Sequence, residues 1–441
     1  MFNYLKEEAF GITKRIRNRD FSGNTGQAVK NSIFQISTTL VAKIGSLLFT
    51  IILARMLLPE LFGLYSLALA TIVLLSGFTD MGITTTLIRF LSKEFSKKKP
   101  NSKGYISYFF RTKLLLTTLT VLVLGLSSYF IANVYYQKPI FYALLAGIFY
   151  TLANSFIGFF SAIPQAKNKF QVILFKEIIF QSLRLIILPL VILFTVVLVD
   201  ELRIFWIILA LALCYSIGLT FLYFNKGISE GKKLNKKQKQ EVNKFILPLT
   251  ATILSGIFFG YIDQIMLGRY VQAEFIGFYS AAFALIGSIG AIIGFAGALF
   301  PIFSRLKGKR LQLGLKKALF VTFPVAILAV LGTLIFAEFG VKLVYGQEYL
   351  AAVQILRLIS FLLISASLTG VYSNYFIAKG RTAFIAKSLV ITTLLNIVLN
   401  YFLITILLKQ GQMLAVYGAA IATLISRYLY LGILIFARWR E

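Results

Sequence analysis

The feature that most constrains the fold is a succession of apolar runs of about twenty residues, which begins at Ser32 and continues to the end of the chain. A helix of that length crosses a hydrocarbon core of about 30 Å, and a helix satisfies all its own backbone polar groups there. Hydrophobic residues make up 58% of the chain and charged residues only 14%, which is more apolar surface than a water-soluble core would bury. The sequence therefore predicts an all-α integral membrane protein. Because many runs follow a charged tail, they are not one cleavable signal peptide.

About twelve runs have the length of a membrane span. They cover residues 32–53, 61–79, 114–134, 140–162, 172–199, 204–223, 245–267, 279–303, 318–336, 356–378, 386–408 and 414–436. Little of the chain is left over for a soluble domain.

The 45 Lys and Arg residues are typical of a nucleic-acid binder until they are placed on this map. The two tails and the even-numbered loops hold 34 of them, and the odd-numbered loops hold seven. Basic residues accumulate in cytoplasmic loops, so we expect a multi-pass protein of the cell membrane with both termini in the cytoplasm. The net charge of +29 then reflects topology and attraction to anionic lipid, and no nucleic-acid partner is expected.

The chain contains a repeat at an offset of 214 residues. Residues 53–68 (LARMLLPELFGLYSLA) align with residues 267–282 (LGRYVQAEFIGFYSAA), and seven of the sixteen positions are identical. Six spans separate the copies, so the halves have the same orientation and predict two six-helix lobes around a central cavity. We expect a tail at 1–31, an N-lobe at 32–224, a solvated basic linker at 225–244 and a C-lobe at 245–441.

The N-terminal tail mixes apolar and basic residues between positions 1 and 20. An interfacial helix that lies on the membrane surface would explain this mixture. A frayed basic tail that serves only topology would explain it equally well, because Gly11 weakens a helix.

The first span has polar residues at spacings of three and four, within an arc of about 80° on a helix. They are Ser32, Gln35, Thr39, Lys43, Ser46 and Thr50. A cation near the middle of a span costs roughly 2.5 to 3.5 kcal/mol if it faces lipid. We therefore expect Gln35, Thr39 and Lys43 to line a substrate path; the alternative is that Lys43 pairs with a buried carboxylate.

Other spans offer similar polar faces. Gln181 and Arg184 share a face of the fifth span, and Asn396 and Asn400 share a face of the eleventh, so all four are candidates to line the same cavity. Asp263 in the seventh span is the candidate for a coupling ion, because a buried carboxylate can take up a proton or bind Na⁺. A salt bridge to the nearby Arg269 is the competing interpretation.

Enzyme chemistry finds little support in the sequence. There is no histidine, no phosphate-binding loop with the Walker A pattern and no Asp-x-Asp pair, so we expect no metal site and no cofactor. The single cysteine, Cys214, excludes an internal disulfide framework. A membrane glycan polymerase or ligase stays an alternative class, although it would usually need a larger external loop than this chain has.

Two motifs resemble a known family. The segment IILARMLLPELFGLYSLALA at 51–70, followed by Asp80-Met-Gly82, resembles the polysaccharide-export flippases of Wzx type, as does YIDQIMLGR at 261–269. These flippases belong to the superfamily of lipid II flippases and multidrug extruders. The motifs cover only the start of each half, whereas the span count and lobe order extend over the whole chain.

The resemblance implies a function. A flippase of this kind moves an oligosaccharide, joined through pyrophosphate to a polyprenol, from the cytoplasmic to the external leaflet by alternating access. It implies a cationic lumen, which Lys43 and Arg184 would supply, and partners among membrane lipids and other glycan-assembly membrane proteins. Proton or Na⁺ coupling stays open, and a cation-coupled multidrug extruder is the alternative within the superfamily. Four charged residues lie in the repeat where spans meet the outer surface, and we call them corner residues. They are Arg55, Glu60, Arg269 and Glu274, and they are expected to be structural.

Overall fold

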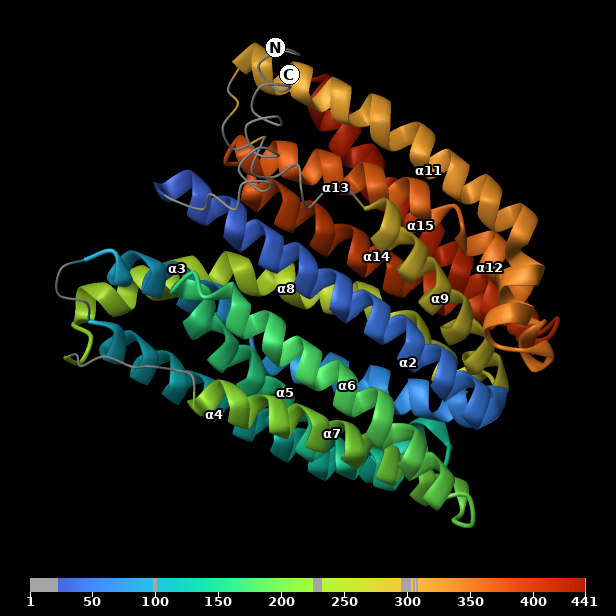
Figure 1. Ribbon diagram of the computed structural model, residues 1–441. Coiled ribbons are helices and arrows are strands. Elements are labelled where there is room, and N and C mark those ends of the chain that lie inside the picture. Colours follow the sequence, from blue (N-terminus) through green and yellow to red (C-terminus); the bar gives the residue numbers. More distant parts are fainter. Residues whose placement is uncertain are drawn as a thin grey trace.

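The computed structural model describes residues 23–97, 101–224, 232–294, 303, 306 and 308–440, so the two interpretations of residues 1–20 concern a segment outside the described residues. The described part of the chain folds into helices joined by short turns (Figure 1). The elements are α2 (Gly23–Ser76), η1 (Gly77–Thr79), α3 (Ile83–Phe95), α4 (Ser102–Tyr129), η2 (Phe130–Tyr136), α5 (Phe141–Ala166), α6 (Phe170–Phe194), α7 (Asp200–Phe224), α8 (Lys236–Tyr270), α9 (Ala273–Ile293), α11 (Gly308–Val344), η3 (Gln347–Tyr349), α12 (Ala352–Ile359), α13 (Leu362–Ala378), α14 (Thr382–Leu408) and α15 (Gln412–Trp439).

The described helices confirm the predicted number of spans. Eleven segments are long and apolar enough to cross a membrane, and the first of them, Lys30–Thr79, is 50 residues long. This segment turns back at Leu58, whose φ of 61° and ψ of 171° interrupt the helix immediately before Pro59. Proline disfavours a helical conformation at the residue before it, so α2 contains two spans. Large apolar side chains such as Val197 and Phe320 are more than 80% exposed, as expected when the bilayer is the solvent.

The twelve spans form two lobes. In Figure 1, α2 to α7 form the N-lobe, and α8, α9 and α11 to α15 form the C-lobe. Helix α8 packs mainly on α14 and also contacts α2. We call the end of the bundle with the turns at Leu58 and at Val271–Gln272 the corner end. The opposite end, where α2 and α8 begin and α15 ends, is the linker end.

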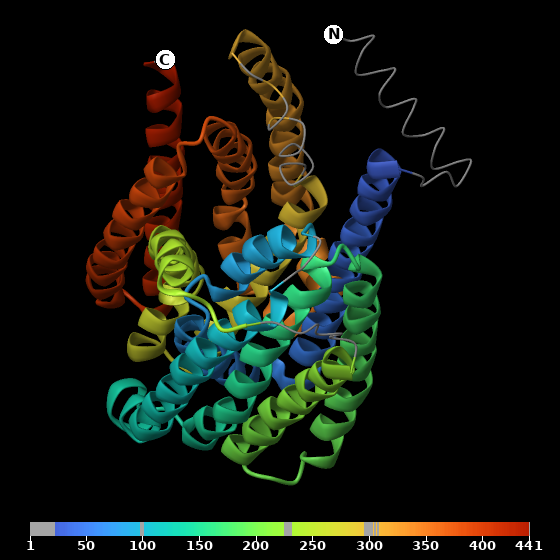
Figure 2. The same ribbon diagram turned by 90° about the vertical axis from the view of Figure 1, so that its left-hand side faces the viewer.

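Packing differs between these two ends. One continuous hydrophobic cluster joins both lobes and includes Leu53 and Tyr65 of the N-lobe and Tyr279 and Tyr349 of the C-lobe. Towards the linker end there are two separate clusters, one built on α3, α4 and α5 and one built on α11, α13 and α15. Figure 2, viewed from the linker end, shows the orange and red helices apart from the blue and green ones.

The described part of the linker, residues 232–244, is mostly exposed and contributes two buried side chains. Helix α8 begins at Lys236, where Asn235 and Gln238 form a reciprocal capping box. Leu234 and Val242 are buried in the cluster of the N-lobe. These two apolar residues among the lysines join the start of α8 to the hydrophobic cluster of α3, α4 and α5.

Candidate functional site

The polar face of the first span is exposed in the linker-end half of α2. Gln35, Thr39 and Lys43 are all exposed there. Leu40 and Ile44 are also 55% and 57% exposed, so the uncovered arc is wider and less polar than the predicted stripe. Within the described residues, Lys43 has no carboxylate at ion-pair distance. A cation in this position is available to an anion that enters from the linker end.

The opposite side of α2 packs closely on α6. A Cβ added at Gly45 would lie 2.5 Å from Oε1 of Gln181, so a larger residue would force the Gln181 side chain to move. Gln181 donates to Oε1 of Glu177 at 2.7 Å and accepts a hydrogen bond from Nη2 of Arg184 at 2.7 Å. The same Nη2 also donates to Oγ of Ser46 at 3.2 Å. These polar side chains form a chain inside the N-lobe.

Arg184 is part of that interior and is only 7% exposed. Its guanidinium carbon lies 4.2 Å from the ring centre of Phe49 and 5.2 Å from that of Phe180. Its Nε has no hydrogen-bond partner among the described residues. The structure thus brings Gln181 and Arg184 together between α2 and α6, where both are buried while Lys43 is exposed.

The C-lobe contains a second polar cluster, around Asp263 of α8. Oδ1 of Asp263 accepts a hydrogen bond from Nδ2 of Asn400 at 2.7 Å, and Oδ2 accepts one from the Tyr279 hydroxyl at 2.6 Å. The Thr423 hydroxyl also donates to Oδ2, and Nδ2 of Asn396 donates to that hydroxyl at 3.2 Å. Every member of this cluster is buried, so Asp263 and the pair Asn396 and Asn400, predicted on two different spans, meet at one site.

Two oxygens of this cluster are unused. Oδ1 of Asn396 and Oδ1 of Asn400 are buried and have no hydrogen-bond partner among the described atoms. Buried polar atoms normally have a partner in the protein, in ordered water or in a bound ion. Carboxylate and amide oxygens suit a hard cation.

The competing pairings of Asp263 are absent from the described residues. No ion pair joins Asp263 to Arg269 or to Lys43. Arg269 instead donates to backbone carbonyls of the N-lobe. The salt bridge from Asp263 to Arg269 was therefore a wrong alternative, because Arg269 points out of the C-lobe.

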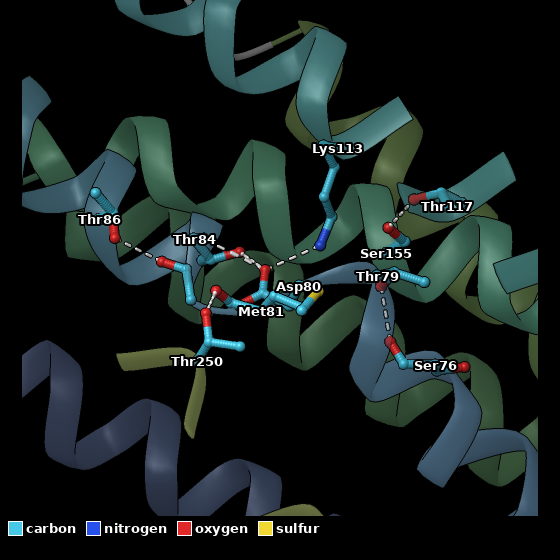
Figure 3. Close-up of polar contacts among 11 residues, drawn as sticks. Ser76, Thr79, Asp80, Met81, Thr84, Thr86, Lys113, Thr117, Ser155 and Thr250 are labelled. Atoms are coloured by element: carbon cyan, nitrogen blue, oxygen red, sulfur yellow. Dashed lines mark hydrogen bonds and ion pairs between the residues drawn. The ribbon is translucent and has the colours of Figure 1, made fainter. Parts of the chain in front are cut away.

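The second span is broken at Asp80 (Figure 3). Gly82 adopts a left-handed φ of 85°, and α3 restarts the helix at Ile83. Oδ1 of Asp80 accepts hydrogen bonds from the backbone N–H of Thr84 at 3.3 Å and from its hydroxyl, and it pairs with Nζ of Lys113 at 2.9 Å. A carboxylate at this helix start offsets the positive end of the α3 dipole.

The position of Lys113 differs from the one predicted from the sequence. We counted it in a loop before the third span, but it lies within α4 and is 1% exposed. Hydropathy misplaced the boundary because α4 extends beyond its most apolar part. A buried lysine needs a counter-charge, and Asp80 supplies it.

The described residues contain no cluster of three or more His, Cys, Asp or Glu side chains that could hold a metal ion. Sequence reasoning also missed Tyr279 and Thr423 as partners of Asp263. A hydroxyl within an apolar span gives the same signal whether it packs, bonds to its own helix or binds a neighbour. In the sequence, Tyr279 was noticeable only as a position of the repeat.

Comparison with known proteins identifies the family. Residues 28–307 match the family described as polysaccharide biosynthesis protein. The chain is 24% identical over 367 residues to a putative O-antigen transporter of Shigella flexneri, covering 78% of this chain and 82% of that protein. It is 23% identical over 201 residues to the probable low-salt glycan biosynthesis flippase Agl15 of Haloferax volcanii, covering 44% of this chain and 41% of that protein.

Solved structures show the same fold. The lipid II flippase MurJ in an inward closed conformation superposes with a TM-score of 0.71 at 15% identity, covering 91% of this chain and 87% of that one. An inward-facing multidrug resistance MATE transporter superposes with a TM-score of 0.59 at 12% identity, covering 93% of this chain and 94% of that one. The resemblance predicted from the corner motifs is thus confirmed, and the chain belongs to the polysaccharide biosynthesis protein family of flippase-like membrane proteins.

Proposed function

We propose that this protein is a flippase that moves a polyprenol-pyrophosphate-linked oligosaccharide from the cytoplasmic to the external leaflet by alternating access. It acts as a transporter and not as an enzyme. The observation that carries the proposal is the difference between the two ends: the lobes share one core at the corner end and have separate cores at the linker end, where Lys43 is exposed. The glycan-related names of the relatives support the substrate class.

The orientation follows from charge. The two tails and the loops at the linker end hold most of the 45 Lys and Arg residues. We therefore assign the linker end to the cytoplasm, and the corner end to the outside of the cell membrane. In this orientation the end at which the lobes have separate cores faces the leaflet on which a lipid-linked sugar would be assembled.

The charge of the proposed substrate explains why a cation is needed. A pyrophosphate bears about two negative charges, and moving it unassisted through hydrocarbon would be prohibitive. Lys43 on the exposed face of α2 supplies a positive charge within the first span, while the polyprenol tail stays in lipid. An inside-negative potential would favour outward passage by roughly 2.3 kcal/mol per charge per 100 mV.

A coupling cation would bind at the Asp263 cluster. The unpaired amide oxygens of Asn396 and Asn400 and the carboxylate of Asp263 form an oxygen-rich set suited to Na⁺. A cation bound to Asp263 would replace at least one of the three hydrogen bonds that its carboxylate now accepts. Proton uptake by Asp263 is the other form of coupling that this cluster allows.

The decisive experiment is a flipping assay with purified protein in proteoliposomes. A polyprenol-pyrophosphate-linked oligosaccharide is supplied in one leaflet, and its arrival in the other is measured with and without Na⁺ and proton gradients. We expect flipping that empty liposomes lack. Efflux of a lipophilic cationic dye without any flipping of the lipid-linked sugar would instead favour the multidrug extruder. Polymerised or transferred glycan in the product would favour the polymerase or ligase.

A further inference from the structure

The two copies of the repeat contact each other directly at the corner end. A Cβ added at Gly63 would lie 1.8 Å from the carbonyl oxygen of Ala273, and one added at Gly277 would lie 2.0 Å from the carbonyl oxygen of Pro59. Gly63 and Gly277 are equivalent residues of the repeat. The contact is therefore reciprocal, as in a two-fold symmetric interface between identical subunits.

The two arginines of the repeat extend this reciprocity across the lobes. Arg55 of the N-lobe donates through Nε to the carbonyl of Val344 at 2.7 Å and through Nη2 to that of Leu343, at the end of α11. Arg269 of the C-lobe donates through Nη1 to the carbonyls of Val134 and Tyr135 at 3.0 and 2.6 Å, at the end of η2. Each guanidinium thus caps the last turn of a helix in the opposite lobe. These turns have unpaired carbonyls and the negative end of the helix dipole.

A second pair of bonds lies beside the arginines. The Tyr349 hydroxyl of the C-lobe donates to the carbonyl of Ala54 at 2.9 Å, and Nζ of Lys138 of the N-lobe donates to the carbonyl of Gly268 at 2.7 Å. Ala54 and Gly268 are again equivalent positions of the repeat. All four side chains therefore bond across the lobe boundary to backbone oxygens.

We infer that Arg55, Arg269, Tyr349 and Lys138 form a reciprocal latch, which holds the corner end closed and must open in every transport cycle. The inference rests on the proposed alternating access and adds the residues that set its balance. A structural corner within one lobe would keep its bonds throughout the cycle. These bonds join opposite lobes, so separation of the lobes at the corner end breaks all of them together.

The latch can open because its two arginines lie at the surface. Both arginines are exposed, so water replaces the carbonyls when the lobes part, and no unpaired charge is buried. Each capping bond involves a charged donor and a dipolar acceptor, so its loss shifts the balance without removing the hydrophobic core. These are positioning residues and are not expected to contact the substrate.

The test measures the lobe separation directly, without substrate. Val199→Cys in the N-lobe turn and Gln410→Cys in the C-lobe turn, both at exposed positions of the corner end, are spin-labelled in a Cys214→Ser background. Double electron–electron resonance spectroscopy of the purified protein in nanodiscs then reports the distance between the two labels. Arg55→Gln and Arg269→Gln should each raise the share of long distances about five- to tenfold, and the double variant should raise it further.

Lys409→Gln is the matched control, because Lys409 is an exposed cation of the corner end within the turn of one lobe. It should leave the distances unchanged. If Arg55→Gln cannot be recovered folded, Arg55→Lys replaces it, since lysine keeps the charge but loses the fork of donors, and a smaller shift is expected. Lower thermal stability with unchanged distances in both arginine variants would overturn the latch and return these residues to a static role. Because no sugar is present, failure of the flipping assay would not alter this result.

Discussion

The corner end and the linker end are built on different kinds of contact. At the corner end the lobes meet through glycines against carbonyl oxygens and through side chains that bond to backbone. At the linker end each lobe packs on its own core, and the start of α8 crosses to the N-lobe. The corner end thus adds close backbone contacts to a hydrophobic core that both lobes share, whereas at the linker end each lobe has its own core. A protein of this kind can exchange which end is closed without unfolding either lobe.

The largest effect is expected from the glycine contact. In Gly63→Ala the new Cβ meets the backbone of Ala273, which no rotamer change can relieve. Overpacking of this kind costs about 1–3 kcal/mol or more, so the closed corner end should lose about a hundredfold in population and flipping should fall accordingly. Gly332→Ala is the control, because its Cβ would meet nothing within 4 Å. Normal flipping by Gly63→Ala would show that the corners do not meet in the working protein.

The second effect concerns the linker end. Lys43→Ala should remove a charge-assisted contact to the pyrophosphate, worth on the order of 1.5 to 3 kcal/mol, and slow flipping roughly ten- to a hundredfold. Lys43→Arg should keep partial function, and Lys43→Glu should be worst because it repels the phosphate. Flipping rate and folded yield are measured together. A well-folded Lys43→Ala that flips normally would refute the phosphate role.

A smaller effect is expected at the Asp263 cluster. Asp263→Asn removes the charge that would hold a cation, so flipping should no longer depend on a Na⁺ or proton gradient. Slow flipping that needs no gradient should persist. The rate in the presence of the gradient should drop about tenfold. Flipping rates at several ion gradients provide the measurement. An unchanged gradient dependence in folded Asp263→Asn would remove this site from the mechanism.

The smallest effect is a pH dependence of the latch. Burial, and then the neighbouring Arg269, lower the pKa of Lys138 to about 8 in this closed corner end. In the open state the side chain returns to water, with a pKa near the ordinary value of about 10.4. The closed state therefore binds fewer protons between these values, and raising the pH from 7 to 9.5 should favour closure.

Solvent screening limits this shift to about two- to fivefold in the ratio of closed to open states. The label pair at Val199 and Gln410 measures it, and Lys138→Gln should remove it. A shift towards the open state at high pH would contradict the assigned cause.

The sequence predicted the spans and the repeat, because hydropathy and identity are visible in a linear pattern. The partners of Arg55 and Arg269 could not be predicted, since backbone carbonyls leave no trace in residue identity. Arg184 and Lys43 were both expected to supply charge to the lumen, yet burial distinguishes them, and burial depends on how α6 packs on α2. Lys113 was misplaced because its helix extends past the apolar run.

The most direct test of alternating access is two-sided labelling of Thr39→Cys, one helical turn from Lys43, in a Cys214→Ser background. Lys237→Cys in the exposed start of α8 marks the cytoplasmic side. At rest, Thr39→Cys should react with a membrane-impermeant maleimide only from the side that labels Lys237→Cys. During transport of the lipid-linked sugar it should become reactive from the opposite side as well. Reaction from the opposite side at rest, or none during transport, would contradict the account.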